Sequence, residues 1–478
     1  YYCYYSAMDA QRGEAGETPP TALAAGPAAA VPAAPAPMHV DAGDTSTPPP
    51  VRPTHVLPRD FRGPEPREDD AEDIAPQPYW VPAVPGTDSL GHTPNMPMNK
   101  NGWRYAAAGP AADRLPQSVF RTLDIAPRGV HWSWQDRSAF MRISRDAAVV
   151  GTDKGFRSAR TNIGVRHGAC YVEVRVLPPD ASSAPAAPMR DGPHARVGWG
   201  RREASLNAPV GYDAYSYGMR DGNGASVTLS RPQPYGEAFG IGDVVGLYIR
   251  LPPADAPPPA GSEARVRRKH IPIRYKNQLY FESLEYAPSR EMEREMDQSR
   301  RGNAREPDEP RARRTFPPQR QKAPSRPLPR LADSCIGFVV NGRPQGIAFA
   351  ELYDFRPLQS ERTAREAASI TAHSSAGAIL KTRENPYDDG SLGYFPMVSL
   401  YGGARAQLIS RDFVFPPAVD LEDQLWRASE ARGHTHVRQH AAPPFRALGD
   451  VYDEWANHEW ACDLDSERIA KECGACEE

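Results

Sequence analysis

The stretch SCIGFVVNGRPQGIAF, residues 334–349, predicts two neighbouring β-strands joined by a tight turn. Apolar side chains dominate on both sides of Asn341 and Gly342, as expected for strands that face a hydrophobic core. Asn-Gly between such runs is a strong hairpin signal, because a two-residue turn needs positive φ angles at both central positions. The stretch therefore predicts antiparallel pairing.

Short runs of this kind, with apolar residues at alternate positions, extend from Met141 to Phe413 and are separated by Gly, Pro, Asn and Asp. The spacing is typical of a β-sandwich or a barrel. The clearest further runs are ACYVEVRV (169–176), HARVGWG (194–200), DVVGLYIRL (243–251) and YFPMVSLYG (394–402). The side chains expected in the core are Tyr171, Val174, Trp199, Val245, Leu247, Ile249, Phe338 and Val340. Trp132 and Trp134 are expected to close the edge of the sandwich rather than to bind a ligand.

The composition limits how much of the chain can pack. The 478 residues include 52 prolines and only 40% are hydrophobic, which predicts one domain of ordinary size. Residues 1–77 are rich in Ala, Pro and acidic residues, so we expect a disordered tail there, with Met8 as the natural start and no signal peptide behind it. Residues 78–135 are expected to pack as an extension on the main domain, residues 136–415.

Three interruptions of the strand pattern, at 178–193, 252–270 and 288–330, are expected to be surface insertions. The last is rich in Pro and Arg, so a disordered loop is the simplest interpretation. Residues 311–330 carry seven Lys or Arg and no acid. They are either a solubilising loop or a contact to DNA or an import receptor, since the formal net charge of −3 leaves only local attraction to nucleic acid. The candidate contacts are Arg311, Arg313, Arg314, Arg320 and Lys322.

The cysteine spacing argues against a disulfide-stabilised protein, and the hydropathy argues against a membrane-spanning one. Six cysteines are scattered without the spacing of a disulfide framework, which favours a reducing compartment. The C-x-x-C at 473–476, near Cys462 and His458, is a weak zinc signal without a second pair, so no metal is expected. No run approaches the roughly 18 uncharged apolar residues that a membrane span needs, so no membrane partner is expected.

The segment HARVGWGRREASLNAPVGYDAYSYGMRDG, residues 194–222, combines arginines, tyrosines and glycines. Strand alternation sends Val197 and Trp199 to the core, so Arg196 must face solvent or a partner. A fixed guanidinium binds carboxylates in a bidentate manner, and a neighbouring proline and tyrosine can cover a peptide backbone. The segment suits an extended acidic peptide, although such residues can also merely satisfy loop carbonyls.

Beyond Pro416 the pattern becomes helical. Leu448, Val451, Tyr452 and Trp455 recur at intervals of three and four, which predicts a short amphipathic helix at about 445–462 within the segment 416–478. Such a helix either folds back onto the β-domain or docks in the groove of a partner.

The order and content of these runs resemble the SPRY domain, a bent antiparallel β-sandwich. The motifs are GACYVEV, ARVGW, GDVVG and FVVNG, and the run NAPVGYDAYSYGMRDG (207–222) is more specific. It resembles the SPRY subunit of COMPASS and MLL-type histone methyltransferase complexes, the "absent, small or homeotic" family in its fungal form. The similarity spans roughly residues 100 to 415, and the family fold implies a binding module without cofactor or catalytic residues.

The resemblance implies two docking sites. A groove for an acidic segment of the WD-repeat propeller subunit would use Phe156, Arg196, Pro209, Tyr212 and Arg220. Phe156 stands where the family usually has tyrosine, so a hydroxyl is missing there. A small helical dimer of the dumpy-thirty type would bind the C-terminal helix through Leu448, Val451, Tyr452 and Trp455.

The expected function is therefore that of a nuclear, non-catalytic scaffold beside a SET-domain methyltransferase that modifies lysine four of histone three, with nucleosomal DNA as a further contact. The alternative is a SPRY substrate adaptor of a ubiquitin ligase, which predicts a RING, F-box-like or SOCS-type element. A carbohydrate-active sandwich would need two converging carboxylates, and Glu173, Asp213 and Asp243 show no pairing signal.

Overall fold

The computed structural model describes residues 54–55, 78–110 except 88, 100 and 101, 120–260 except 188, then 262, 267–268, 271–302 except 287, 326–358, 388–433 and 443–474. The chain divides into two units, Tyr1–Pro50 and Val51–Glu478, and all described residues belong to the second. The predicted contacts at 311–322 lie outside the described residues.

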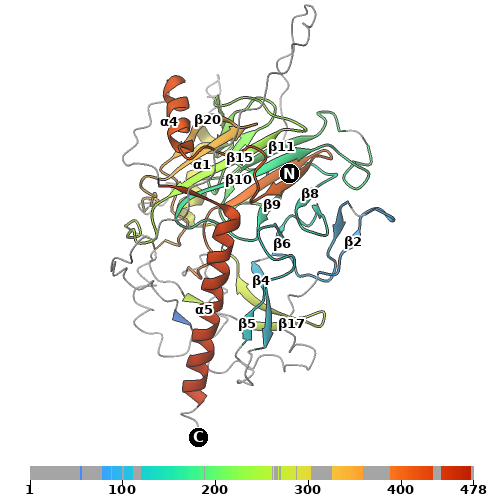
Figure 1. Ribbon diagram of the computed structural model, residues 1–478, viewed down its shortest axis with the longest axis vertical. Helices are drawn as coiled ribbons and strands as arrows, with labels where there is room; N and C mark the ends of the chain where they lie inside the picture. The colour runs from blue at the N-terminus through green and yellow to red at the C-terminus, as the bar shows by residue number, and fades with distance from the viewer. Residues whose placement is uncertain are drawn as a thin grey trace, which may run out of the picture. The chain divides into compact units, whose positions relative to one another are not determined.

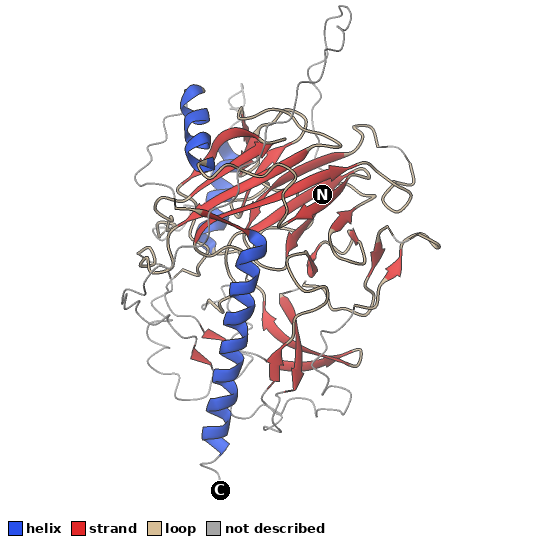
Figure 2. Cartoon of the chain, viewed as in Figure 1, coloured by secondary structure: helices blue, strands red, loops and turns tan. Residues whose placement is uncertain are grey.

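Two antiparallel sheets form the body of the fold (Figures 1 and 2). The ten-stranded sheet has the order β2-β3-β7-β8-β22-β10-β15-β19-β20, with β23 beside β10. Its strands are β2 Val81–Pro82, β3 Gly91–His92, β7 Arg142–Ile143, β8 Val149–Gly151, β10 Gly168–Leu177, β15 Val244–Leu251, β19 Cys335–Val340, β20 Arg343–Ala350, β22 Arg405–Ile409 and β23 Phe445–Ala447. β23 pairs with β10 in parallel, whereas the other pairings in this sheet are antiparallel.

The seven-stranded sheet has the order β14-β13-β12-β11-β21-β9-β6. Its strands are β6 Trp132–Arg137, β9 Arg157–Thr161, β11 His194–Gly200, β12 Ser216–Arg220, β13 Ser226–Thr228, β14 Arg231–Gln233 and β21 Phe395–Tyr401. β6 crosses the boundary expected at 135/136, so the expected extension contributes directly to this sheet.

Two smaller sheets complete the β-structure. β4 Trp103–Pro110, β5 Phe120–Thr122, β17 Ile271–Tyr275 and β18 Gln278–Leu284 form one, in the order β17-β18-β4-β5. β1 Thr54–His55 and β16 Arg267–Arg268 form the other. The third sheet joins segments about 170 residues apart in sequence, Trp103–Ala107 and Tyr280–Leu284.

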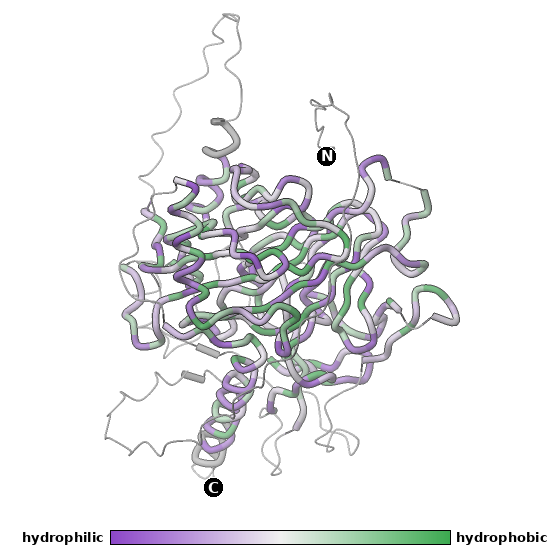
Figure 3. The backbone as a smooth tube through the Cα atoms, turned by 45° about the horizontal axis from the view of Figure 1, so that its top comes forward, coloured by the Kyte–Doolittle hydropathy of each residue, from purple (hydrophilic) through white to green (hydrophobic). Residues whose placement is uncertain are grey.

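The core lies between the two large sheets and follows the predicted alternation. Val172 and Leu247 from one sheet and Val197 and Val398 from the other belong to one buried cluster. Seven of the eight side chains predicted for the core belong to this cluster, as do Trp132 and Trp134 on the edge strand β6. The eighth, Tyr171, is buried on the reverse face of β10, in a second cluster. Figure 3 shows apolar stretches along these central strands.

The Asn-Gly turn is confirmed. Asn341 and Gly342 have φ angles of 48° and 77°, and Val340 pairs with Arg343 across the hairpin. The Asn341 side chain also accepts from the Val244 backbone N–H at 2.9 Å and so ties the hairpin to β15.

Two helices in the described residues correct the expected loops. α1 Arg290–Gly302 lies inside the insertion at 288–330, where we expected no secondary structure, and it buries Met292 in the core. α4 Leu421–Ala431 lies in the expected linker and covers the outer face of the ten-stranded sheet (Figure 1). Leu421, Leu425 and Trp426 pack there against the reverse face of β10, β15 and β19.

The C-terminal helix is longer than expected. α5 runs from Leu448 to Gly474, whereas the prediction ended at residue 462, and residues 445–447 form strand β23 instead of the first helical turn. The strand positions the start of the helix, because its three residues pair with Ala169, Cys170 and Tyr171 of β10.

Candidate functional site

A row of four polar side chains crosses the seven-stranded sheet. Arg220 on β12 lies opposite Arg196 on β11, Arg196 lies opposite Ser399 on β21, and Ser399 lies opposite Ser158 on β9. Residues directly opposite each other in a sheet share a face. The row therefore occupies one face, and Val197 points to the core on the other face.

The two serines hold the loop between β11 and β12 over this face. The Ser399 Oγ accepts from the Val210 backbone N–H at 2.7 Å, and the Ser158 Oγ donates to the Ala208 carbonyl at 2.6 Å. The hydroxyls lie 2.6 Å apart, so Ser399 must donate to Ser158, whose single proton is already used. Every donor of the pair is satisfied, which fixes the loop relative to the arginines.

The loop presents Pro209 and Tyr212 in one tight turn. The Tyr212 backbone N–H donates to the Pro209 carbonyl at 3.0 Å, and the Tyr212 side chain is 39% exposed. Gly211 has φ +80°, and a Cβ there would come within 2.4 Å of the Val227 carbonyl oxygen. Only glycine can serve at this position, because it has both the conformational freedom and the missing side chain.

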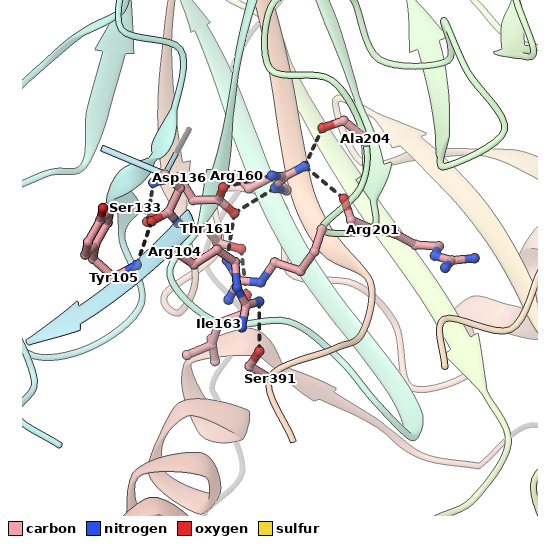
Figure 4. Close-up of polar contacts among 12 residues, drawn as sticks. Arg104, Tyr105, Ser133, Asp136, Arg160, Thr161, Ile163, Arg201, Ala204 and Ser391 are labelled. Carbon is pink, nitrogen blue, oxygen red and sulfur yellow. Dashed lines mark hydrogen bonds and ion pairs between the residues drawn. The ribbon is translucent and has the colours of Figure 1, made fainter. Parts of the chain in front are cut away.

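A buried ion pair anchors the preceding part of the same loop (Figure 4). The Arg160 guanidinium contacts Asp136 through Nε and Nη2, both at 2.8 Å, and its Nη1 donates to the carbonyls of Arg201 and Ala204, also at 2.8 Å. Burial alone would raise the pKa of the Asp136 carboxyl, but Arg160 and Arg202 outweigh burial and hold that pKa below its usual range.

Aromatic rings lie beside the row of arginines and serines. The Arg196 guanidinium stacks 4.8 Å from the centre of the Phe156 ring, within the range of a cation–π contact. The Phe156 ring lies 5.2 Å from that of Tyr401, and Tyr401 pairs with His194 across β21 and β11. The face therefore combines arginine side chains with a group of mutually tilted aromatic rings.

The neighbouring acid does not neutralise Arg220. The Asp221 carboxylate is the nearest acid in sequence to Arg220, but it accepts from the Ala195 backbone N–H at 2.9 Å and contacts His194 Nδ1 at 2.8 Å. Within the described part of the chain, no carboxylate pairs with Arg220. An acidic ligand would supply that partner.

All five residues predicted for the acidic-peptide groove thus lie on this face or on the loop over it. Phe156 precedes β9, Arg196 and Arg220 lie on adjacent strands, and Pro209 and Tyr212 form the turn. Sequence reasoning missed further residues of the face, whose placement depends on strand register. These are Ser158, Ser399, His194 and Tyr401.

The structure places the four predicted dimer anchors on the first two turns of α5. Leu448 and Tyr452 are buried in the chain's own core, and Val451 and Trp455 pack partly against it. The helix therefore folds back onto the domain over this part, which is one of the two alternatives that the sequence left open. Trp460, 62% exposed, and Leu464, 43% exposed, lie further along α5.

Contacts with β5 and with Asp124, which follows it, fasten both halves of α5. Asp463 accepts from the Thr122 backbone N–H at 2.9 Å, and Glu467 lies 3.8 Å from the Arg121 guanidinium. Tyr452 donates to Asp124, which follows β5. Burial raises the pKa of the Asp124 carboxyl to about 6, although Arg128 and a backbone N–H partly oppose the shift.

The described residues bear on two further sequence features, the weak metal signal near Cys462 and the hydropathy. Cys462 Sγ lies 3.7 Å from His458 Nε2 on the same helix. No group of three or more potential metal ligands gathers within the described ranges. None of the helices there is long and apolar enough to cross a membrane.

Comparison with known proteins agrees with this architecture. The family model described as SPRY domain matches residues 182–253, from the loop before β11 to just past β15, and so contains Arg196, Arg220 and the turn between them. Together with the two facing antiparallel sheets, this match defines a SPRY-domain protein.

Curated relatives show which kind of SPRY-domain protein the chain resembles. The chain is 34% identical to the "Set1 complex component ash2" of Schizosaccharomyces pombe over 74% of this chain and 46% of that protein. It is 34% identical to the "COMPASS component cclA" of Colletotrichum higginsianum, over 72% of this chain and 61% of that one. The "COMPASS component BRE2" of Saccharomyces cerevisiae is 26% identical over 64% of this chain and 76% of its own. The chain belongs to this family of Ash2-type SPRY proteins and spans about half the length of the curated relatives it matches first.

Proposed function

We propose that the chain is a non-catalytic, nuclear subunit of a COMPASS-type complex that methylates lysine four of histone three. The names of its relatives support the complex. The observation that carries the docking role is the pair of arginines opposite each other, beside Phe156 and below the fixed turn of Pro209 and Tyr212. This arrangement suits an extended acidic segment, which we assign to the WD-repeat propeller subunit.

The mechanism is indirect. Arg196 and Arg220 hold the acidic segment, and the bound propeller subunit then favours the arrangement of the SET-domain catalytic subunit that can react. A scaffold of this kind changes the population of competent complexes and not the chemical step. The binding energy comes from charge-assisted hydrogen bonds on a surface whose turn and strands are already in place, so little ordering is needed on binding.

The second docking role falls to α5, which would bind a helical dimer of the dumpy-thirty type in the helix-in-groove mode. The predicted anchors Leu448 and Tyr452 are buried, so we assign the contact to the exposed side of α5, with Val451 and Trp455 at its margin. Nucleosomal DNA is a further proposed contact, through residues 311–330. Unchanged nucleosome affinity at low salt after their deletion would contradict that contact.

The test is affinity capture from nuclear extract with the wild-type chain and with Arg196→Ala/Arg220→Ala. The wild type is expected to recover a WD-repeat propeller, a SET-domain methyltransferase and a small helical dimer, and the double variant is expected to lose the propeller selectively. The matched control is Arg343→Ala/Arg427→Ala, which removes two arginines that are 67% and 65% exposed on β20 and α4. Recovery of ubiquitin-ligase components would favour the adaptor alternative instead.

A further inference from the structure

Tyr401 occupies the end of β21, at the edge of the candidate groove. It pairs with His194 on β11, and its ring lies 6.0 Å from the His194 ring and 5.2 Å from the Phe156 ring. It lies two positions after Ser399, so both side chains point to the same face of the sheet. Tyr401 therefore shares the face that carries Arg196 and Arg220.

The hydroxyl of Tyr401 differs from those of the buried tyrosines. Tyr394 donates to the Tyr353 carbonyl at 2.6 Å, and Tyr235 and Tyr248 also hydrogen-bond within the protein. Tyr401 is only partly buried, and its hydroxyl makes no hydrogen bond to any residue that the structure describes. A phenol in this state keeps its donor for solvent or for a ligand.

The Tyr401 hydroxyl matters because Phe156 lacks the hydroxyl that the family usually has at that position. The Arg196 guanidinium lies over the Phe156 ring, and the Tyr401 ring contacts the same ring. A ligand carboxylate at Phe156 would therefore have a guanidinium and a phenol within reach. Hydrogen bonds to ionised groups are about twice as strong as neutral ones, so the phenol would add to both affinity and specificity.

We propose that Tyr401 is a ligand-binding residue of the groove and that its hydroxyl donates to a carboxylate of the bound acidic segment. It supplies from β21 the hydroxyl that Phe156 lacks. The inference rests on the proposed function, since it concerns the same ligand. It adds a residue that the sequence did not single out.

The experiment measures fluorescence anisotropy with a labelled synthetic peptide that carries the acidic segment of the propeller subunit. Tyr401→Phe removes the hydroxyl alone and is expected to weaken binding about tenfold, the effect of roughly 1.4 kcal/mol from one hydrogen bond to a charged group. Adding Phe156→Tyr to that variant is expected to recover most of the loss. Tyr79→Phe, on a side chain 59% exposed and outside the groove, is the control and is expected to bind like the wild type.

The possible results separate the two ideas. If Arg196→Ala/Arg220→Ala abolishes binding while Tyr401→Phe stays within about twofold of wild type, the role of Tyr401 is wrong and the groove remains. A loss that Phe156→Tyr does not recover, or that accompanies a lower thermal midpoint, also overturns it, because the hydroxyl then acts through the fold. A wild-type chain that does not bind the peptide overturns both proposals.

Discussion

Arg196 and Arg220 lie directly opposite each other on the antiparallel strands β11 and β12. Like charges in this position destabilise a sheet, typically by a few tenths of a kcal/mol up to about 1 kcal/mol. Side chains chosen only for stability would not be placed in this way. The pairing is therefore an arrangement that the acidic ligand proposed above would favour, because its carboxylates would lie between two like charges.

Arg220→Thr is expected to stabilise the free domain and to weaken ligand binding. Thr removes the like charge and suits a strand, so the free energy of unfolding should rise by about 0.5 kcal/mol. Affinity for the acidic peptide should fall at least tenfold, as expected for loss of one charge-assisted contact. Chemical denaturation and anisotropy measure the two effects. The control is Arg231→Thr on β14, where Thr228 and not an arginine is opposite, and a lower stability of Arg220→Thr would contradict the argument.

Ser399→Ala is expected to loosen the turn that carries Pro209 and Tyr212. It leaves the buried Val210 N–H without its acceptor, which costs about 1–3 kcal/mol. Peptide affinity should fall with stability, because the turn is no longer fixed beside the arginines. Ser391→Ala is the control: it removes a serine that bonds Asp389 and Arg104 elsewhere. If Ser399→Ala lowered stability and left affinity unchanged, the turn would not belong to the site.

Arg160→Met and Arg137→Met should differ sharply, although both arginines are buried. Arg160 pairs with Asp136 and caps two loop carbonyls, so its loss should cost about 3 kcal/mol or more. The Arg137 side chain hydrogen-bonds only to Thr93 and Met98 among the described residues, and burial lowers its pKa to about 10. Because an unpaired buried cation costs free energy, Arg137→Met should be neutral or stabilising. Denaturant unfolding of the two variants tests the contrast, and equal losses would contradict it.

The sequence predicted features that depend on neighbouring residues. The Asn341-Gly342 turn and the alternate core-facing side chains along β10, β15 and β19 are local, and both were found. Burial of the opposite face of these strands was not predicted, because it depends on α4. The helix α4 carries a comparable signal, because Leu421, Leu425 and Trp426 lie on one face. The sequence interpretation assigns this segment to a linker and so does not predict the helix. Charged residues dominate α1, so its composition resembled the disordered insertion around it.

Features that depend on register could not be predicted in the same way. Ser158 and Ser399 are 241 residues apart, and only the strand order β11-β21-β9 brings them next to Arg196. The pairing of β4 with β18 is equally remote. The motif runs quoted for the family hold Arg196, Pro209, Tyr212 and Arg220 at fixed spacing, and the resemblance added Phe156. Tyr401 joins their face only through the pairing of β21 with β11, which the sequence does not show.

The exposed side of α5 should decide binding of the helical dimer. Trp460→Ser/Leu464→Ser is expected to weaken binding at least tenfold with little change in stability, because both side chains are largely exposed. Leu448→Ala should instead lower stability by about 2–5 kcal/mol, since it leaves a cavity in the core. Calorimetric titration with the purified dimer, and thermal unfolding, measure the two effects. Loss of binding with Leu448→Ala at full stability would restore the anchors first predicted.

Asp124→Asn should change how the stability of the chain depends on pH. Burial raises the pKa of Asp124 from 3.8 to about 6 in the folded chain, so the folded state holds its proton more tightly than the unfolded chain does. The contribution of Asp124 to stability is therefore full below about pH 4, declines as the pH rises, and is lost above about pH 6.

Asparagine cannot ionise and can still accept from Tyr452. The variant is therefore expected to match the wild type near pH 4 and to be the more stable of the two at pH 7. Denaturant unfolding across this range measures the difference in stability between the wild type and the variant. The Asp136 carboxyl, whose pKa is shifted in the opposite direction, is present in both chains and so does not affect that difference. A difference that does not vary with pH would show that Asp124 stays ionised beneath α5. The helix would then be held by a charged carboxylate, and its attachment would not weaken as the pH rises to neutrality.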